Sequence, residues 1–193
     1  MAVREIVMYA EHEAVLRRES EPVKAVTRSV RRLVRDLEDT LYAHPDGAGL
    51  AAPQIGVHRC VVVVRLGACP DEEREPGPPE ALINPVIIEA GDERSDFDGC
   101  LSFPGLFGKT IRPHQLRISA WNEAGQAIKR TLEGFDAVLV HHEIDHLKGI
   151  VFVDRIQDIT DLCRVRRNEQ GQLVRVPLDQ SLRQAAAPRL WDN

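Results

Sequence analysis

The chain has 193 residues, 43% of them hydrophobic, so it is long enough for one domain with a sizeable core and too short for two. A formal net charge of −5, with basic residues interleaved among acidic ones, gives no signature of nucleic-acid binding. No segment approaches the ~18 consecutive apolar residues of a membrane span, and charges run through the first 20 residues. We therefore expect a single domain over residues 1–193 that is cytoplasmic and has no membrane partner.

A long amphipathic helix is expected over residues 23–43, near the N-terminus. Two segments rich in β-branched residues, 60–66 and 81–88, follow it and are typical of strands. The segment between these strands carries four prolines and is expected to be an exposed loop. The helix is predicted because apolar residues recur at helical spacing with charged residues between them: Val26, Val30, Leu33, Val34, Leu37 and Leu41.

A β-hairpin and a second helix are expected next. Residues 115–134 begin with alternating apolar and polar side chains and pass through the turn-like segment 122–125, which predicts a hairpin. Residues 136–148 are typical of a helix, with Gly149 as its C-terminal cap.

The pattern weakens after Asp158, so residues 159–193 are treated as a C-terminal extension of uncertain structure. Within it, residues 165–176 are compatible with a hairpin, and residues 184–193 with partial disorder.

The second helix carries the segment HHEIDH, residues 141–146. His142 and His146 are four residues apart, so both imidazoles project from one helix face and can bind a single divalent ion. Glu143 is then free to serve as a general base. Because short motifs of this kind also occur by chance, a solvated helix with incidental histidines is an equally good interpretation of the six residues alone.

A third ligand decides between the possible metal sites. Metzincin proteases would place a histidine where this chain has Phe152, and no glutamate occurs between Glu143 and Glu169 to serve as in thermolysin-like enzymes. Cys100, in the segment DGCLSFPG, is the remaining candidate, although a lone cysteine is more often a small buried apolar residue.

A further segment, GAGLAAPQ at residues 47–54, combines small residues with one amide side chain. Small residues allow a backbone to approach a substrate closely, and Gln54 can donate a hydrogen bond to a developing oxyanion. Taken by itself, the segment is more typical of a loop between a helix and a strand.

Together, GxGLAAPQ, GCLS and HExDH occur in the order that resembles the peptide deformylases. The resemblance begins near residue 4, includes INP and PGLFGKTIRP, and ends near GIVFVDRI at residues 149–156. It implies an α+β fold in which antiparallel β-strands pack around a central metal-binding HExxH helix, in agreement with the predicted elements. It also implies an enzyme that removes the N-formyl group from N-formylmethionine of new polypeptides and releases formate.

The resemblance also assigns roles to residues. The expected metal ligands are Cys100, His142 and His146. Glu143 matches the catalytic glutamate that moves the proton, and Gln54 and the backbone amide of Leu101 match the oxyanion donors. Gly49, Leu50, Val138 and Leu139 match residues that contact the substrate. The implied cofactor is one divalent metal ion, frequently Fe2+, with Zn2+, Ni2+ or Co2+ as substitutes, and the implied partners are nascent N-formylmethionyl peptides and, transiently, the ribosome.

Two positions depart from the usual family pattern. Asp98 replaces a glutamate before GCLS, and His141 replaces a glutamine before the first metal histidine. We expect Asp98, or one of the neighbouring acidic residues, to pair with Arg112 and hold the cysteine loop. Two alternatives to deformylation stay open: a general metallopeptidase, which would cleave unformylated peptides internally, and a non-catalytic metal-binding module, which would need neither Glu143 nor Gln54.

Overall fold

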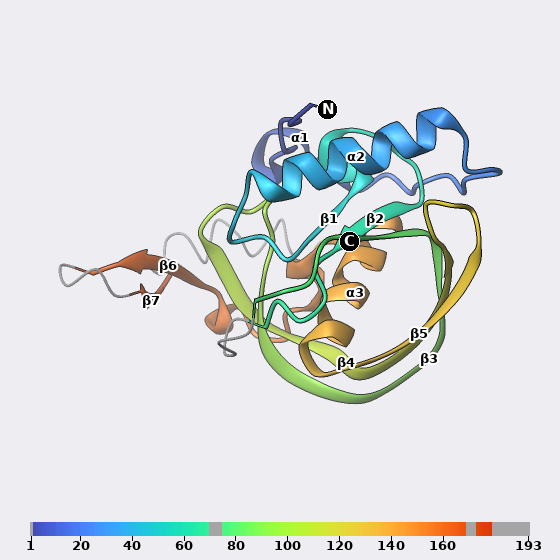
Figure 1. Cartoon of the computed structure of the whole chain (residues 1–193). Coiled ribbons are helices and arrows are strands. Elements are labelled where there is room, and N and C mark those ends of the chain that lie inside the picture. Colours follow the sequence, from blue (N-terminus) through green and yellow to red (C-terminus); the bar gives the residue numbers. More distant parts are fainter. Residues whose placement is uncertain (1, 70–74, 169–172, 179–193) are drawn as a thin grey trace.

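The computed structural model describes residues 2–69, 75–168 and 173–178. Its centre is a curled antiparallel sheet of seven strands in the order β1-β2-β3-β4-β6-β7, with β5 also paired to β4. The strands are β1 (Gly49–Ala51), β2 (Val61–Val64), β3 (Glu80–Gly99), β4 (Leu106–Trp121), β5 (Ala127–Glu133), β6 (Cys163–Arg167) and β7 (Leu173–Pro177). The long strands β3 and β4 curve around helix α3 (Gly134–Leu147) (Figure 1).

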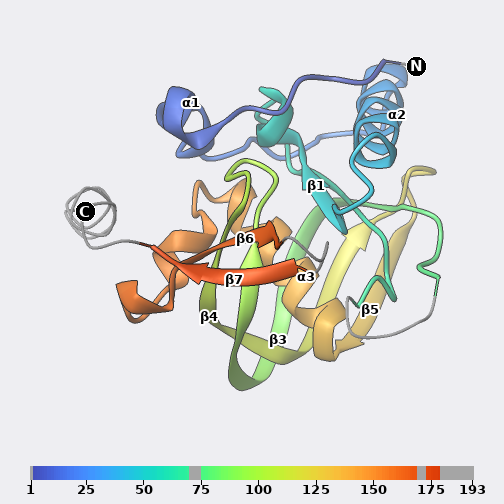
Figure 2. The same cartoon turned by 90° about the vertical axis from the view of Figure 1, so that its left-hand side faces the viewer.

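Two more helices lie on the same side of the molecule, above the sheet and α3, at opposite ends of that side (Figure 2). They are α1 (Tyr9–Leu16), which the sequence analysis did not anticipate, and α2 (Arg28–Tyr42). Helix α2 begins later than the expected residue 23, because Thr27 is its N-cap: the Thr27 side chain accepts a hydrogen bond from the Val30 N–H. Short 3-10 turns η1 (Ala52–Ile55), η2 (Phe152–Arg155) and η3 (Ile159–Asp161) complete the described elements.

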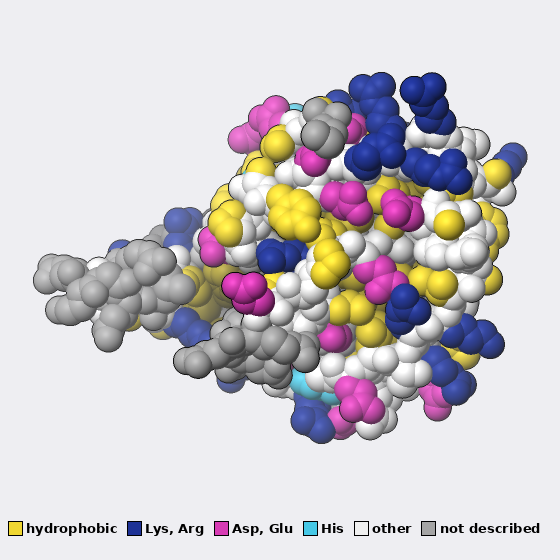
Figure 3. All heavy atoms as spheres, in the orientation of Figure 1, with side chains coloured by type: hydrophobic (Ala, Val, Ile, Leu, Met, Phe, Trp, Pro, Cys, Tyr) yellow, Lys and Arg dark blue, Asp and Glu magenta, His cyan; other side chains and the backbone are white. Residues whose placement is uncertain are grey.

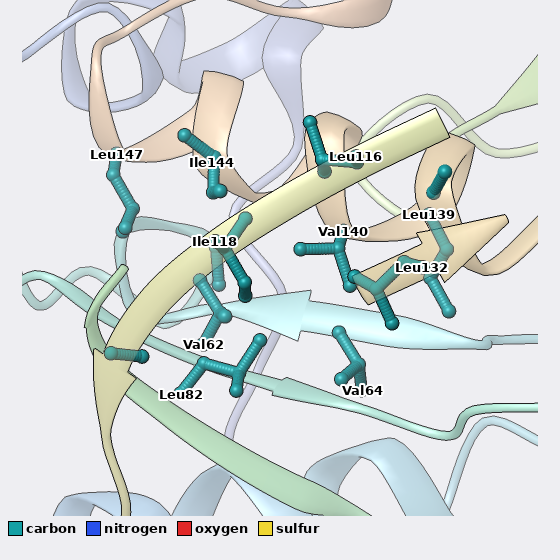
Figure 4. Close-up of a cluster of buried hydrophobic side chains, with 13 residues drawn as sticks. Val62, Val64, Leu82, Leu116, Ile118, Leu132, Leu139, Val140, Ile144 and Leu147 are labelled. Atoms are coloured by element: carbon teal, nitrogen blue, oxygen red, sulfur yellow. The ribbon is translucent and has the colours of Figure 1, made fainter. Parts of the chain in front are cut away.

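Strand β2 separates two parts of the hydrophobic core. Val62 and Val64 pack against α3 together with Leu82, Ile118 and Val140, as Figure 4 shows. Val61 and Val63 point to the opposite face and pack under α2. All four valines are fully buried, which explains why β2 reads as a continuous apolar run instead of an alternating one. A third cluster surrounds Phe152.

Strand β3 is much longer than the predicted segment 81–88, since it continues to Gly99. Its second half is polar and largely exposed, and the register with β4 shifts twice, between Ile83 and Val86 and between Ile87 and Glu89. Such irregularities bend a strand and increase its twist. The bend brings the end of β3 back toward α3. As a result, Asp98 and Cys100 lie against histidines of that helix.

The C-terminal extension begins with a hairpin, β6–β7, that projects from the body of the fold (Figure 1). It is joined to the main sheet where Leu106 and Phe107 of β4 pair with Arg164 and Cys163. The predicted partial disorder of residues 184–193 lies outside the described residues.

The face of the molecule drawn in Figure 3 carries side chains of both charges. Lys and Arg side chains gather over α2, with Asp and Glu side chains close by (Figure 3). Among the described residues, no helix is long and apolar enough to cross a membrane.

Candidate active site

Three potential metal ligands come together between α3 and the end of β3. The ligand atoms of Cys100, His142 and His146 all lie within 4.8 Å of one another, and Cys100 Sγ is 3.3 Å from His146 Nε2. Both histidines are buried, whereas Cys100 is half-buried. One turn of helix separates the histidines, and Cys100 directly follows the last residue of β3, so two elements far apart in sequence build one cluster.

Asp98 fixes the orientation of His142. Asp98 Oδ1 lies 2.9 Å from His142 Nδ1, while Asp98 Oδ2 accepts a hydrogen bond of 2.7 Å from Arg112 Nε. Burial opposes the ionised carboxylate, but the charges of His142 and Arg112 outweigh it and hold the pKa of Asp98 well below its usual value. Since a carboxylate only accepts, His142 Nδ1 carries the hydrogen and Nε2 is left for a metal ion.

Arg112 is the central side chain of the supporting network and is only 1% exposed. Besides Asp98, its guanidinium donates to Asp145 Oδ2 at 2.8 Å and meets His141 Nδ1 at 2.8 Å. Because a guanidinium can only donate, His141 Nδ1 is the acceptor. Burial lowers the pKa of His141 to about 4, with the positive charge of Arg112 acting in the same direction, so His141 is neutral at physiological pH.

Glu143 lies against the backbone of β1. The side chain is 3% exposed, and its Oε2 has no hydrogen-bond partner among the described residues. A Cβ built on Gly49 would stand 2.6 Å from Glu143 Oε1, so a larger residue at position 49 would require this carboxyl or the strand to move. Desolvation raises the pKa of Glu143 to about 7. A buried carboxyl with one oxygen unpartnered among the described residues is suited to exchange a proton.

Gln54 approaches the same cluster from η1. Its Nε2 is 3.4 Å from Cys100 Sγ and 3.3 Å from Ser102 Oγ, and the residue is 2% exposed. Leu101 follows Cys100 directly, so its backbone amide is adjacent to the cluster. The predicted donors Gln54 and Leu101 are therefore both close to the three candidate metal ligands.

A family model described as polypeptide deformylase matches residues 3–161, which is most of the chain. The chain belongs to the peptide deformylase family. A peptide deformylase of Aquifex aeolicus is 42% identical over 157 residues, covering 80% of this chain and 88% of the relative. One of Thermomicrobium roseum is 41% identical over 170 residues, covering 88% of this chain and 95% of the relative.

Solved deformylase structures share the fold. The crystal structure of peptide deformylase from Ehrlichia chaffeensis has a TM-score of 0.74 and 28% identity, covering 99% of this chain and 96% of that chain. The structure of that enzyme in complex with actinonin has a TM-score of 0.73 and 29% identity, covering 100% of this chain and 98% of that chain. The mixed helix and strand fold with a curled antiparallel sheet is thus that of the deformylases.

Of the residues predicted to contact the substrate, two lie near the candidate active site and two have side chains packed in the core. Gly49 lies beside Glu143, and Val138 stands one helical turn before His142. The Leu50 side chain, however, is fully buried in the core under α2, so only its backbone can border a substrate. Leu139 packs mainly into the core between α3 and the sheet (Figure 4).

Sequence reasoning assigned no role to three residues near the site. Thr110 donates a hydrogen bond to Asp98 Oδ2 at 3.2 Å, and Asp145 bridges Arg112 and Arg155. Ser102 reaches Gln54. Asp145 and Ser102 lie within the motifs HHEIDH and GCLS, so their positions were visible, but their partners come from distant segments.

Proposed function

We propose that this chain removes the N-formyl group from the N-formylmethionine of newly synthesised polypeptides and releases formate, with a divalent metal ion bound by Cys100, His142 and His146. Membership of the peptide deformylase family makes the chain a hydrolase of protein biosynthesis. The observation that supports the mechanism is Glu143, a buried carboxyl whose Oε2 has no hydrogen-bond partner among the described residues and which lies on the same helix as both histidines of the Cys/His/His cluster.

The donor set fits a metal ion. One thiolate and two imidazoles suit Fe2+, Zn2+, Ni2+ and Co2+, and the short distances among the three ligand atoms match a site for a single ion. The Asp98 contact fixes the His142 tautomer that such a ligand needs. A bound ion would act as a Lewis acid on the formyl carbonyl and make a water molecule more acidic. We propose Fe2+ as the working metal, with the other three as substitutes.

Glu143 is proposed to move the proton. Its carboxylate would take a proton from the attacking water and then deliver that proton to the departing amine, so the carboxyl returns to its starting state. Gln54 Nε2 and the Leu101 backbone amide would donate hydrogen bonds to the formyl oxygen as negative charge develops on it. The Asp98–Arg112 pair would keep His142 in place throughout.

The methionine side chain is proposed to lie along Val138 and Leu139, with the backbone of Gly49 and Leu50 bordering the peptide. These apolar walls favour an unbranched, uncharged side chain. Because the proposed substrates are nascent chains, we propose that the enzyme acts in the cytoplasm and contacts the ribosome transiently. We also propose that residues 1–193 form one catalytic domain, since the extension is attached to the main sheet through the pairing of β4 with β6.

The test is formate release from formyl-Met-Ala-Ser by the metal-loaded protein, with metal content measured on the same sample. We expect turnover of the formyl peptide and no internal cleavage of unformylated peptides. Absence of formate release from a folded protein loaded in turn with iron, nickel and zinc would refute the proposed function. Internal cleavage of unformylated peptides would support a general metallopeptidase instead.

A further inference from the structure

We propose that Ser102 is a positioning residue, which holds the side-chain amide of Gln54 in the orientation needed to stabilise the formyl oxygen. The inference rests on the proposed function, because it concerns an oxyanion donor of that reaction. Ser102 is 1% exposed, and its Oγ lies 3.3 Å from Gln54 Nε2.

The orientation of the Gln54 amide is fixed on its other side by the backbone. The Ala51 N–H donates a hydrogen bond of 2.8 Å to Gln54 Oε1. Because a backbone N–H can only donate, the atom facing it must be the oxygen, and the NH2 group must face the cluster. The amide therefore cannot be flipped without losing this bond.

The two hydrogens of the NH2 group face different acceptors, one an oxygen and the other a sulfur. One acceptor is Ser102 Oγ at 3.3 Å, and the other is Cys100 Sγ at 3.4 Å. Cys100 is also a proposed metal ligand, so the substrate oxygen would arrive on its side of the amide and replace it as the acceptor. The hydrogen on the Cys100 side is therefore the one that a substrate oxygen beside the cluster would accept, while the hydrogen on Ser102 keeps the amide plane in place.

Ser102 is itself held firmly relative to Gln54. The Tyr9 N–H donates to the Ser102 backbone oxygen at 3.0 Å, and the Val7 N–H donates to the Gln54 backbone oxygen at 2.8 Å. One short N-terminal segment thus bonds to the backbone of both residues. Since Gln54 is only 2% exposed, little water is available to replace the Ser102 hydroxyl if that hydroxyl is removed.

The experiment compares Ser102→Ala with Ser102→Thr in the metal-loaded protein, using formyl-Met-Ala-Ser. Losing one hydrogen bond that orients a donor should lower kcat about tenfold, with KM and metal content unchanged, and Thr should restore most of the rate because it keeps the hydroxyl. Ser20→Ala is the matched control, because Ser20 is also buried but its Oγ has no hydrogen-bond partner among the described residues.

A double-mutant cycle separates positioning from general damage. If Ser102 acts through Gln54, Ser102→Ala should cause no further loss of kcat in a Gln54→Ala background. An equal loss in both backgrounds would overturn the proposal, as would Ser102→Thr being as slow as Ser102→Ala.

A second readout does not depend on activity. The Gln54 side-chain amide signals, assigned in the zinc-loaded protein by their absence from Gln54→Ala, should shift in Ser102→Ala and stay unchanged in Ser20→Ala. Unchanged Gln54 signals in Ser102→Ala would also overturn the proposal. If the wild-type protein released no formate, the proposed function would fail, and these signals would still show whether Ser102 holds the amide.

Discussion

Replacing Gly49 with Ala tests whether β1 sets the position of Glu143. A Cβ at residue 49 would lie 2.6 Å from Glu143 Oε1 and 2.9 Å from both Glu143 Cδ and Cγ. Real Cβ contacts essentially never come this close, so either the carboxyl or the strand must move. Gly49 does not have positive φ, so the backbone itself accepts alanine. The predicted effect of Gly49→Ala on activity therefore comes from steric overlap and not from backbone strain.

The expected losses of stability and of rate follow from the position of the displaced Glu143 carboxyl, which is buried beside the site. Inserting a methyl group into a packed interior typically costs about 1–3 kcal/mol, and roughly 2–4 °C of Tm accompanies each kcal/mol in a protein of this size. Displacing a catalytic group by about 1 Å can cost on the order of 10²-fold in rate. We expect Gly49→Ala to lower kcat on formyl-Met-Ala-Ser by about that factor, while the metal ligands and metal content remain intact.

The matched control is Gly91→Ala in β3. Among the described residues, a Cβ there would meet only Gln115 Oε1, at 3.9 Å, so the same chemical change is made in a strand without steric overlap. We expect wild-type kcat and a Tm change within a degree or so, because surface substitutions usually change stability by less than about 0.5 kcal/mol. Full activity of Gly49→Ala would refute the idea that contact between β1 and Glu143 sets the position of the base.

Three further predictions concern the base, the pocket and the metal. Glu143→Gln should keep its metal and lose at least ~10²- to 10⁴-fold in formate release; loss of metal with normal activity per bound ion would make Glu143 structural. Formyl-Met peptides should be turned over much faster than formyl-Asp peptides, since Val138 and Leu139 offer a buried charge no partner, and comparable rates would contradict this pocket. Iron-loaded protein should lose activity on exposure to peroxide while nickel-loaded protein survives, because the iron and the Cys100 thiolate are both oxidisable; equal activity and resistance with iron, nickel and zinc would reject iron as the working metal.

The local parts of the site could be predicted from sequence because they depend on spacing along one element. His142 and His146 share a face of α3 through their four-residue separation. Gly149 follows the end of that helix with φ +72°, a conformation that glycine adopts without strain. The four valines of β2 predicted a strand from composition alone. They did not predict that both faces of this strand are covered.

The supporting contacts could not be predicted in the same way, because they join segments far apart in the chain. Asp98 and His142 are 44 residues apart, and their contact depends on how strongly β3 and β4 curl. The polar second half of β3 carries no apolar alternation, since its side chains are largely exposed. A hydrophobic pattern reports which residues are buried, so it does not report a strand whose role is to bend around a helix.

The buried network around Arg112 explains why the replacement at His141 is compatible with the site. Arg112 is paired with two carboxylates, Asp98 and Asp145, so its own charge is compensated without residue 141. Residue 141 must then supply a neutral acceptor, and a histidine with Nδ1 unprotonated provides one, as a glutamine side-chain oxygen would. A lysine or arginine at position 141 would add a second buried positive charge beside Arg112. A neutral acceptor of suitable reach therefore fits this position, and the sequence alone could identify the substitution but not the contact with Arg112.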